Sequence, residues 1–249
     1  MKKILFCCFI CFSLISTSQT RFDFFVGTTI SSLSEDLMVD YGFEQFREDY
    51  IDAGGSTTSD AKNSVRLGIY LAAEADFSIG EKSFVKTGLK YVTTGDSYFF
   101  KTDDVVLQSS SGSESDEKFK LRPRLDYLAI PVNYGINVSD VISIYGGVTP
   151  SLNINNVIRT NRFEEDGDDL KQKWDSNDNP VAETSLVTFL NAGISYYLGE
   201  GSGTAMVFDL RFSQALNNVY DDSNFSNTTA KFNDTKLWSL ELGIGIALR

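Results

Sequence analysis

One acidic stretch holds the densest group of side chains that could bind a cation: EEDGDDLKQKWDSNDNP at positions 164–180. In proteins Ca²⁺ takes six to eight oxygen ligands, and carboxylates are common among them. The EF-hand spacing fails here, because Pro180 stands where that loop needs its glycine. A solvated acidic loop is therefore the favoured interpretation. The weak metal candidate within it consists of Glu164, Glu165, Asp166, Asp168 and Asp169.

Groups suited to acid–base or nucleophilic catalysis are scarce. The chain has no histidine, the commonest general base and metal ligand, and its three cysteines all fall within the first eleven residues. No G-x-S-x-G motif marks a nucleophile elbow. Two couples, Asp209 with Arg211 and Glu74 with Asp76, could do acid–base work, but the opposite charges around them favour structural ion pairing. The sequence thus predicts a non-enzymatic protein without catalytic residues or cofactors, and a lipid-modifying enzyme is the third hypothesis.

Eight segments carry these side chains on the period-two alternation of apolar and polar residues that is typical of strands. In VRLGIYLAAEADFSI, for example, Leu67, Ile69 and Leu71 share one face, whereas Arg66 and Glu74 share the other. Eight is the smallest common strand number for a closed membrane barrel. The predicted strands are residues 22–30, 65–79, 83–93, 125–136, 141–154, 185–198, 205–214 and 237–248.

The connections between these segments alternate in length, at about 34, 3, 31, 4, 30, 6 and 22 residues. Outer-membrane barrels have short periplasmic turns and long external loops, and an even strand number puts both termini on the periplasmic side. The long connections are acidic, with 25 acidic and 10 basic residues in 32–64, 96–121, 155–184 and 217–235. The predicted fold is an all-β, eight-stranded antiparallel up-and-down transmembrane barrel with four long external loops.

The polar faces of the strands carry nearly balanced charges, as the interior of a narrow barrel would require. An eight-stranded barrel is only just wide enough for its own side chains, so we predict a filled lumen rather than an open pore. Glycines on the same faces leave room for Tyr70, Tyr145 and Tyr197. The predicted lumen charges are Asp23, Arg66, Glu74, Asp76, Lys86, Lys90, Asp209, Arg211 and Glu241.

A soluble secreted barrel of lipocalin type, binding a small hydrophobic ligand, is the main alternative. Such a barrel would bury Leu67, Ile69 and Leu71 and expose Arg66 and Glu74. Strands of about 9 to 15 residues, which are long enough to cross a bilayer when tilted, favour the membrane instead. Aromatic residues also gather at the two ends of the apolar faces, where interfacial girdles belong. These aromatics are Phe22, Phe77, Tyr134 and Tyr196 at one end and Tyr91, Phe212 and Trp238 at the other.

The first eighteen residues, MKKILFCCFICFSLISTS, have the pattern of a secretory signal. Two lysines precede an apolar run that is too short to span a bilayer, and small residues follow it. We predict a cleaved signal peptide at 1–18 and a single barrel domain at 19–249, located in the outer membrane and in contact with its lipid. The net charge of −12 argues against a nucleic-acid partner.

Three short motifs stand out along the chain: LDYLAIPVNYGI at 125–136, GLKY at 88–91 and DLRFSQAL at 209–216. Together they resemble segments of the PorT-like outer-membrane β-barrel family of Bacteroidetes. In the first, Tyr127, Leu128, Ile130 and Pro131 match the Y-L-E-I-P signature, and Ala129 stands where the family usually has Glu. The resemblance implies an eight-stranded outer-membrane barrel. Since the family includes secretion-system accessories alongside many proteins without an assigned role, the resemblance implies no shared activity. Our own expectation is a role through the surface loops or as an accessory of an envelope complex.

Pro131 interrupts the middle of a predicted strand. A proline removes one ladder hydrogen bond, so in sheets it is found at edges or bulges. We therefore expect the Pro131 ring to point into the lumen, at a local β-bulge that accommodates the missing donor.

Overall fold

The computed structural model describes residues 20–33, 62–102, 117–163, 169–174, 184–199, 203–220 and 235–248. All of the regular structure in these ranges is β-strand. The described residues contain no helix that is long and apolar enough to cross a membrane. The predicted signal peptide and the domain boundary after residue 18 lie outside the described residues. The strands are β1 (Thr20–Leu33), β2 (Lys62–Ser78), β3 (Ser83–Thr102), β4 (Glu117–Ala129), β5 (Val132–Asn137), β6 (Ile142–Phe163), β7 (Asp169–Trp174), β8 (Leu186–Leu198), β9 (Thr204–Ala215) and β10 (Leu237–Leu248).

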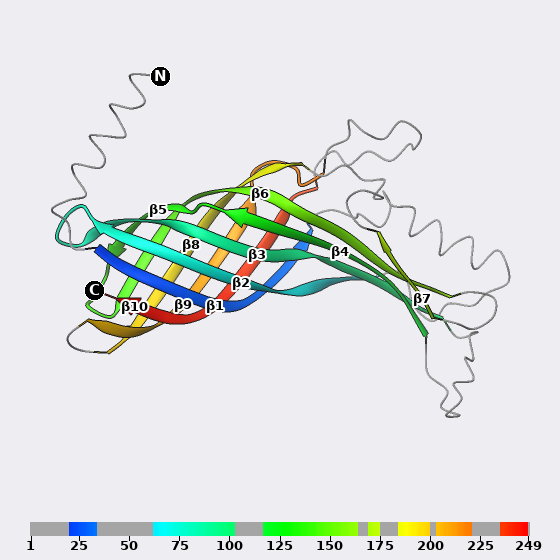
Figure 1. Ribbon diagram of the computed structural model, residues 1–249, viewed down its shortest axis with the longest axis horizontal. Helices are drawn as coiled ribbons and strands as arrows, with labels where there is room; N and C mark the ends of the chain where they lie inside the picture. Colours follow the sequence, from blue (N-terminus) through cyan, green and yellow to red (C-terminus); the bar gives the residue numbers. More distant parts are fainter. Residues whose placement is uncertain are drawn as a thin grey trace, which may run out of the picture.

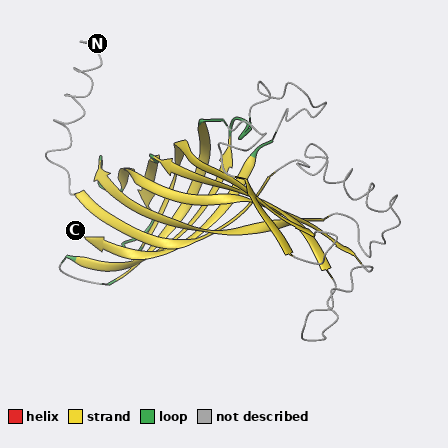
Figure 2. Cartoon of the chain, turned by 45° about the vertical axis from the view of Figure 1, so that its right-hand side comes forward, coloured by secondary structure: helices red, strands yellow, loops and turns green. Residues whose placement is uncertain are grey.

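The strands form one antiparallel sheet that closes on itself (Figures 1 and 2). Each wall strand pairs with its sequence neighbours, β10 pairs with β1, and the β2–β3 pairing completes the ring. β4 and β5 both lie between β3 and β6, so they are two halves of one wall strand. The wall therefore has the eight antiparallel, up-and-down strands that the sequence predicts.

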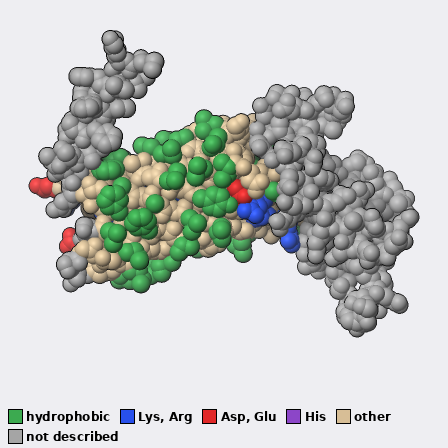
Figure 3. Space-filling model, in the orientation of Figure 1, with side chains coloured by type: hydrophobic (Ala, Val, Ile, Leu, Met, Phe, Trp, Pro, Cys, Tyr) green, Lys and Arg blue, Asp and Glu red, His purple; other side chains and the backbone are tan. Residues whose placement is uncertain are grey.

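The two faces of the wall have opposite chemistry, because successive side chains of a strand point to opposite sides. On β2, Leu67 is 69% exposed, Ile69 55% and Leu71 49%, whereas Glu74 is buried. Other strands repeat this division, and Figure 3 shows hydrophobic side chains spread over the outer wall. The soluble-barrel alternative is therefore wrong about which face is buried.

Glycines make room for large lumen side chains. A Cβ atom on Gly243 would lie 1.7 Å from the hydroxyl oxygen of Tyr70, and one on Gly27 would lie 2.5 Å from the Tyr70 ring. In the same way, a Cβ on Gly193 would come within 2.4 Å of Tyr145. The predicted pairing of glycines with lumen tyrosines is confirmed for Tyr70 and Tyr145, and it explains how so narrow an interior holds them.

Pro131 lies between β4 and β5 and is buried on the lumen side, as predicted. The predicted bulge at this position is wrong. The register runs without a shift from Ala129 to Val132 against both neighbouring strands, and the irregularity in this strand falls between Asp126 and Tyr127. The amide of Ile130 donates to the Pro150 carbonyl at 3.0 Å, so the ladder continues beside the proline and holds the register.

Several strands extend further than the sequence predicts. β3 continues to Thr102, β4 begins at Glu117, and β6 continues to Phe163 and pairs there with β7. Figure 1 shows β2, β3, β4, β6 and β7 continuing past the ends of β1 and β10. Parts of the predicted loops 96–121 and 155–184 are therefore strand. The reason is that each extended strand has a partner, so its backbone groups are paired beyond the barrel rim.

Candidate functional site

The lumen contains a network of buried ion pairs, and its first centre is Lys86 of β3. The Lys86 ammonium lies 3.1 Å from Asp23, 3.6 Å from Asp76 and 3.8 Å from Glu74. Tyr197 of β8 donates a hydrogen bond to Asp23 at 3.2 Å. These residues come from three wall strands besides β3, so the network crosses the lumen and joins opposite parts of the wall.

Arg211 of β9 is the second centre, and its side chain is fully buried. Its two terminal nitrogens donate to both oxygens of Glu74 at 2.8 and 2.9 Å, a bidentate pair of the strong kind. Its Nε donates to the Tyr145 hydroxyl at 2.9 Å, and Tyr145 in turn donates to Asp209 at 2.8 Å. Ser195 also donates to Asp209, at 2.7 Å. Glu74 thereby links this centre to Lys86.

Lys90 forms the third centre, with Glu241 of β10 as its partner. The Lys90 ammonium lies 2.8 and 3.1 Å from the two Glu241 oxygens. Its neighbour across the β3–β4 ladder is Ala129, which carries no charge. In this chain, the carboxylate that pairs with Lys90 therefore comes from β10.

Eight of the nine predicted lumen charges are buried as expected, and the exception is Arg66. Arg66 is only half-buried, and it donates to the Pro123 carbonyl at 3.4 Å towards the end of the barrel that carries the strand extensions. Arg21 of β1 contributes a charge to the lumen network that is not among the charges predicted from the sequence. Its guanidinium pairs with Asp76 and Asp23 and lies over the Tyr197 ring, 3.9 Å from the centroid. The sequence reading missed Arg21 because it began the first strand at residue 22, although Arg21 has the same alternation.

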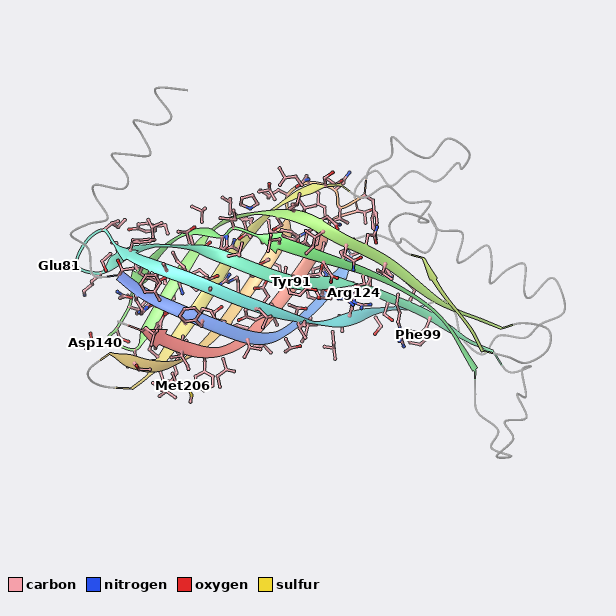
Figure 4. The ribbon with its side chains drawn as sticks, in the orientation of Figure 1. Glu81, Tyr91, Phe99, Arg124, Asp140 and Met206 are labelled. Carbon is pink, nitrogen blue, oxygen red and sulfur yellow. The ribbon has the colours of Figure 1, made fainter. Side chains whose placement is uncertain are left out.

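A cavity of about 830 Å³ opens at the short-turn end of the barrel. Arg21, Asp76 and Phe84 line it on the barrel side, and the β2–β3 and β5–β6 turns line the remainder. Glu81 and Asp140 of these turns lie at this end in Figure 4. Since Arg21 and Asp76 also belong to the ion network, the cavity is a vestibule that ends at the filled lumen.

The predicted acid–base couples do not form an exposed site. Asp209 and Arg211 are 3.4 Å apart, but both are buried, as are Glu74 and Asp76. Glu164, Glu165, Asp166 and Asp168 lie outside the described residues, and Asp169 begins β7. Among the residues that the structure describes, no group of three or more His, Cys, Asp or Glu side chains is placed to hold a metal ion. These carboxylates serve as ion-pair and hydrogen-bond partners inside the wall, and Asp76, which is paired with Arg21 and Lys86, also lines the vestibule.

The Lys90 pair leads to a rescue prediction. We expect Glu241→Gln to lower the free energy of unfolding by about 3 kcal/mol, because it leaves the buried Lys90 ammonium without its carboxylate. Adding Ala129→Glu should restore part of that loss, because directly opposite residues on a ladder have their Cβ atoms about 5 Å apart. Urea unfolding followed by tryptophan fluorescence measures both variants. A double variant that is no more stable than Glu241→Gln alone would contradict the conclusion that the loss comes from the unpaired Lys90 ammonium.

No protein-family model matches this chain, and no curated protein sequence matches it significantly. Similar solved structures include Ail, the attachment invasion locus protein of Yersinia pestis, which has 11% sequence identity and a TM-score of 0.42 over 92% of this chain and 99% of that one. Neisserial surface protein A has 13% identity and a TM-score of 0.34 over 94% and 99%. The outer-membrane protease OmpT from Escherichia coli has 8% identity and a TM-score of 0.38 over 93% and 96%.

Proposed function

We propose that this chain is an outer-membrane β-barrel protein without enzymatic activity, whose lumen is closed by its own side chains. The observation that carries the proposal is that the two faces of the wall are placed in the reverse order to those of a soluble barrel. Apolar side chains face outward on the wall strands, and the ion pairs face inward. Soluble monomers rarely expose contiguous apolar patches above a few hundred Å². A closed sheet with an apolar exterior satisfies its backbone groups internally, which is the condition for crossing a bilayer with strands.

We further propose that the short turns and both termini face the periplasm. Phe22 at the start of β1 pairs with Leu248 at the end of β10. The N-terminal end of the first wall strand therefore lies beside the C-terminal end of the last one. The β2–β3 and β5–β6 turns lie at the same end in Figure 1, and β1 ends and β2 begins at the opposite end. Short turns on the periplasmic side and long loops outside are the usual arrangement in outer-membrane barrels.

Membership of the PorT-like family, with a role as an accessory of an envelope complex, is the finer proposal. Its support is the signature segment in the wall, where Leu128 and Ile130 face outward and Tyr127 and Pro131 face the lumen. In such a role the contacts with partner proteins would come from the loops and the vestibule. Pull-down from native membranes with the tagged full-length chain tests this role, and recovery of the barrel without any envelope protein would count against it.

The barrel itself is tested by membrane fractionation and by gel migration. We expect the protein in the outer-membrane fraction, with faster migration before boiling than after it, because a closed barrel stays compact in detergent. In planar bilayers we expect no stable conductance step, since the ion network fills the lumen. Recovery in the soluble fraction would overturn the membrane location, and a steady conductance would overturn the closed lumen.

A further inference from the structure

Basic residues are concentrated in the strand extensions, and acidic residues are concentrated in the loops beyond them. The four long connections that the sequence predicts contain 25 acidic and 10 basic residues. Eight of these basic residues lie in the strand extensions, but only three of the acidic ones do. The basic residues are Lys62, Lys101, Lys118, Lys120, Arg159, Arg162, Lys171 and Lys173, and the acidic ones are Asp96, Glu117 and Asp169. The extensions are therefore basic in a chain with a net charge of −12.

The strand register puts most of these basic positions on one face of the extended sheet. On β4, residues 118, 120, 122 and 124 are all Lys or Arg, and alternate residues of a strand share a face. The neighbouring strands continue the rows, since Arg122 pairs with Arg159 and Arg159 with Lys173. Further pairs are Lys120 with Asn161, Asn161 with Lys171, Lys101 with Lys118, and Lys62 with Phe99, which itself pairs with Lys120. We call this set the basic sheet face: Lys62, Lys101, Lys118, Lys120, Arg122, Arg124, Arg159, Lys171 and Lys173.

One row of the basic sheet face brings like charges directly opposite each other. Arg122, Arg159 and Lys173 occupy register positions on three adjacent strands, which lie about 4.8 Å apart in any sheet. Like charges directly opposite on a ladder destabilise the pairing. An anion shared by the row would remove this repulsion, so the row favours binding of a multivalent anionic group.

The basic sheet face begins where the apolar outer wall ends. On the outward side of β4, Ile130 is 53% exposed and Leu128 39%. Towards the extension the next outward residues are Asp126 and Arg124, and Arg122, which follows them, is exposed. Figure 3 shows acidic and basic side chains together at this end of the hydrophobic surface, and Figure 4 places Arg124 beyond Tyr91 on the way to the extension.

Arg124 is held in place at this boundary. Its Nε donates to Asp126 at 2.9 Å, and one terminal nitrogen lies 2.9 Å from the other Asp126 oxygen. Asn155 of β6 donates to the same carboxylate at 2.8 Å, and the Tyr91 hydroxyl accepts from Arg124 at 3.4 Å. Asp126 is buried by these contacts, while the Arg124 side chain keeps 30% of its surface exposed. The chain therefore fixes a guanidinium at the edge of the apolar surface and leaves part of it open.

We propose that the basic sheet face binds the phosphate groups of lipid headgroups in the membrane leaflet next to the long loops. The inference rests on the proposed outer-membrane location. The face begins as the direct continuation of the lipid-facing side of β4, so the layer beside its first residues, Arg124 and Arg122, is the headgroup layer. Guanidinium groups match phosphate oxygens with two parallel hydrogen bonds, and clusters of Lys and Arg beside a membrane-spanning segment recognise anionic headgroups.

The test uses the full-length barrel and a triple variant in which Arg122→Gln, Arg159→Gln and Lys173→Gln remove one row of charge. Detergent-solubilised protein is titrated with diphosphorylated lipid A, and bound lipid is counted by native mass spectrometry. We expect the half-saturating lipid concentration to rise at least tenfold in the triple variant, and to rise in the wild type with added salt, because salt screens exposed charges. Arg162→Gln is the matched control, because Arg162 pairs with Leu170 on the opposite face of β6, and it should bind like the wild type.

The outcomes separate this inference from the proposed function. Heat-modifiable migration and membrane fractionation report whether each variant is a folded, inserted barrel. If the folded triple variant binds lipid A as tightly as the wild type, the basic sheet face is not the site. If inorganic phosphate displaces lipid A at equal phosphate concentration, the site takes a free anion and the assignment to lipid is wrong. A soluble, non-inserting chain would overturn the proposed function instead.

Discussion

Replacing Arg211 with methionine is expected to lower the free energy of unfolding of the barrel by about 3–5 kcal/mol, the usual cost of leaving a buried charge without its partner. Arg211 is fully buried and holds Glu74 through two hydrogen bonds, while its Nε supports Tyr145. Methionine fills a similar volume and supplies no charge. Equilibrium unfolding in urea, followed by tryptophan fluorescence, measures the loss.

A second substitution shows whether the loss comes from the uncompensated carboxylate. Adding Glu74→Gln to Arg211→Met should recover part of the stability, because the remaining lumen acids keep other partners: Asp209 keeps Tyr145 and Ser195, and Glu241 keeps Lys90. Arg122→Met is the control, since Arg122 is exposed, and surface changes of this kind stay within about 0.5 kcal/mol. Equal stability of Arg211→Met and wild type would show that the network contributes nothing to holding the wall.

Gly243→Ala is expected to destabilise the barrel by about 1–3 kcal/mol, the range for overpacking a filled interior. The added methyl group would lie 1.7 Å from the Tyr70 hydroxyl, and Tyr70 is fully buried, so the ring has no free space to enter. Thermal unfolding of the refolded protein, read from gel migration, gives the change. Gly80→Ala in the β2–β3 turn is the control, because its nearest neighbour atom would be 3.8 Å away.

The cause of this effect can be isolated with Tyr70→Phe. That change removes the hydroxyl oxygen and leaves the ring, so Gly243→Ala should cost clearly less in a Tyr70→Phe background than in the wild type. The difference between the two costs is the interaction energy of the pair. The same cost in both backgrounds would mean that the glycine serves another purpose than making room for Tyr70.

The faces of the wall were predictable from the sequence because the pleat has a period of two and a closed barrel has one inside. Once Leu67, Ile69 and Leu71 are assigned to the outer face, the position of Glu74 follows, and the structure agrees. The partners were not predictable. Which strands face each other across the lumen depends on the stagger of the strands around the barrel, and alternation carries no information about it. The pairing of Lys90 with Glu241 is of this kind.

The extension of the wall strands is a different case, because its signal was present. Residues 118–125 read KFKLRPRL, in which basic and apolar residues alternate strictly. Residues 96–121 are predicted from the sequence to form a long connection, although a polar outer face is also what a strand that continues beyond the membrane needs. The first strand is predicted to begin at residue 22, which leaves out Arg21, and this error has the same cause. Where a strand ends depends on whether the neighbouring strand continues beside it. The sequence of a single segment carries no information about which strand that neighbour is or where it ends.

The pairing between β1 and β10 also bears on how the barrel folds, because it closes the ring. Phe22 and Leu248 are register partners from the two ends of the described chain, so the last seam of the ring joins strands that are far apart in the sequence. Contacts between distant residues form slowly, because the chain entropy lost in closing a long loop precedes any gain from the pairing. Until that seam forms, both terminal strands present unpaired edges, on which strands of other molecules could add. For a barrel in the proposed outer-membrane location, protection by a holding chaperone would therefore matter most before the ring closes.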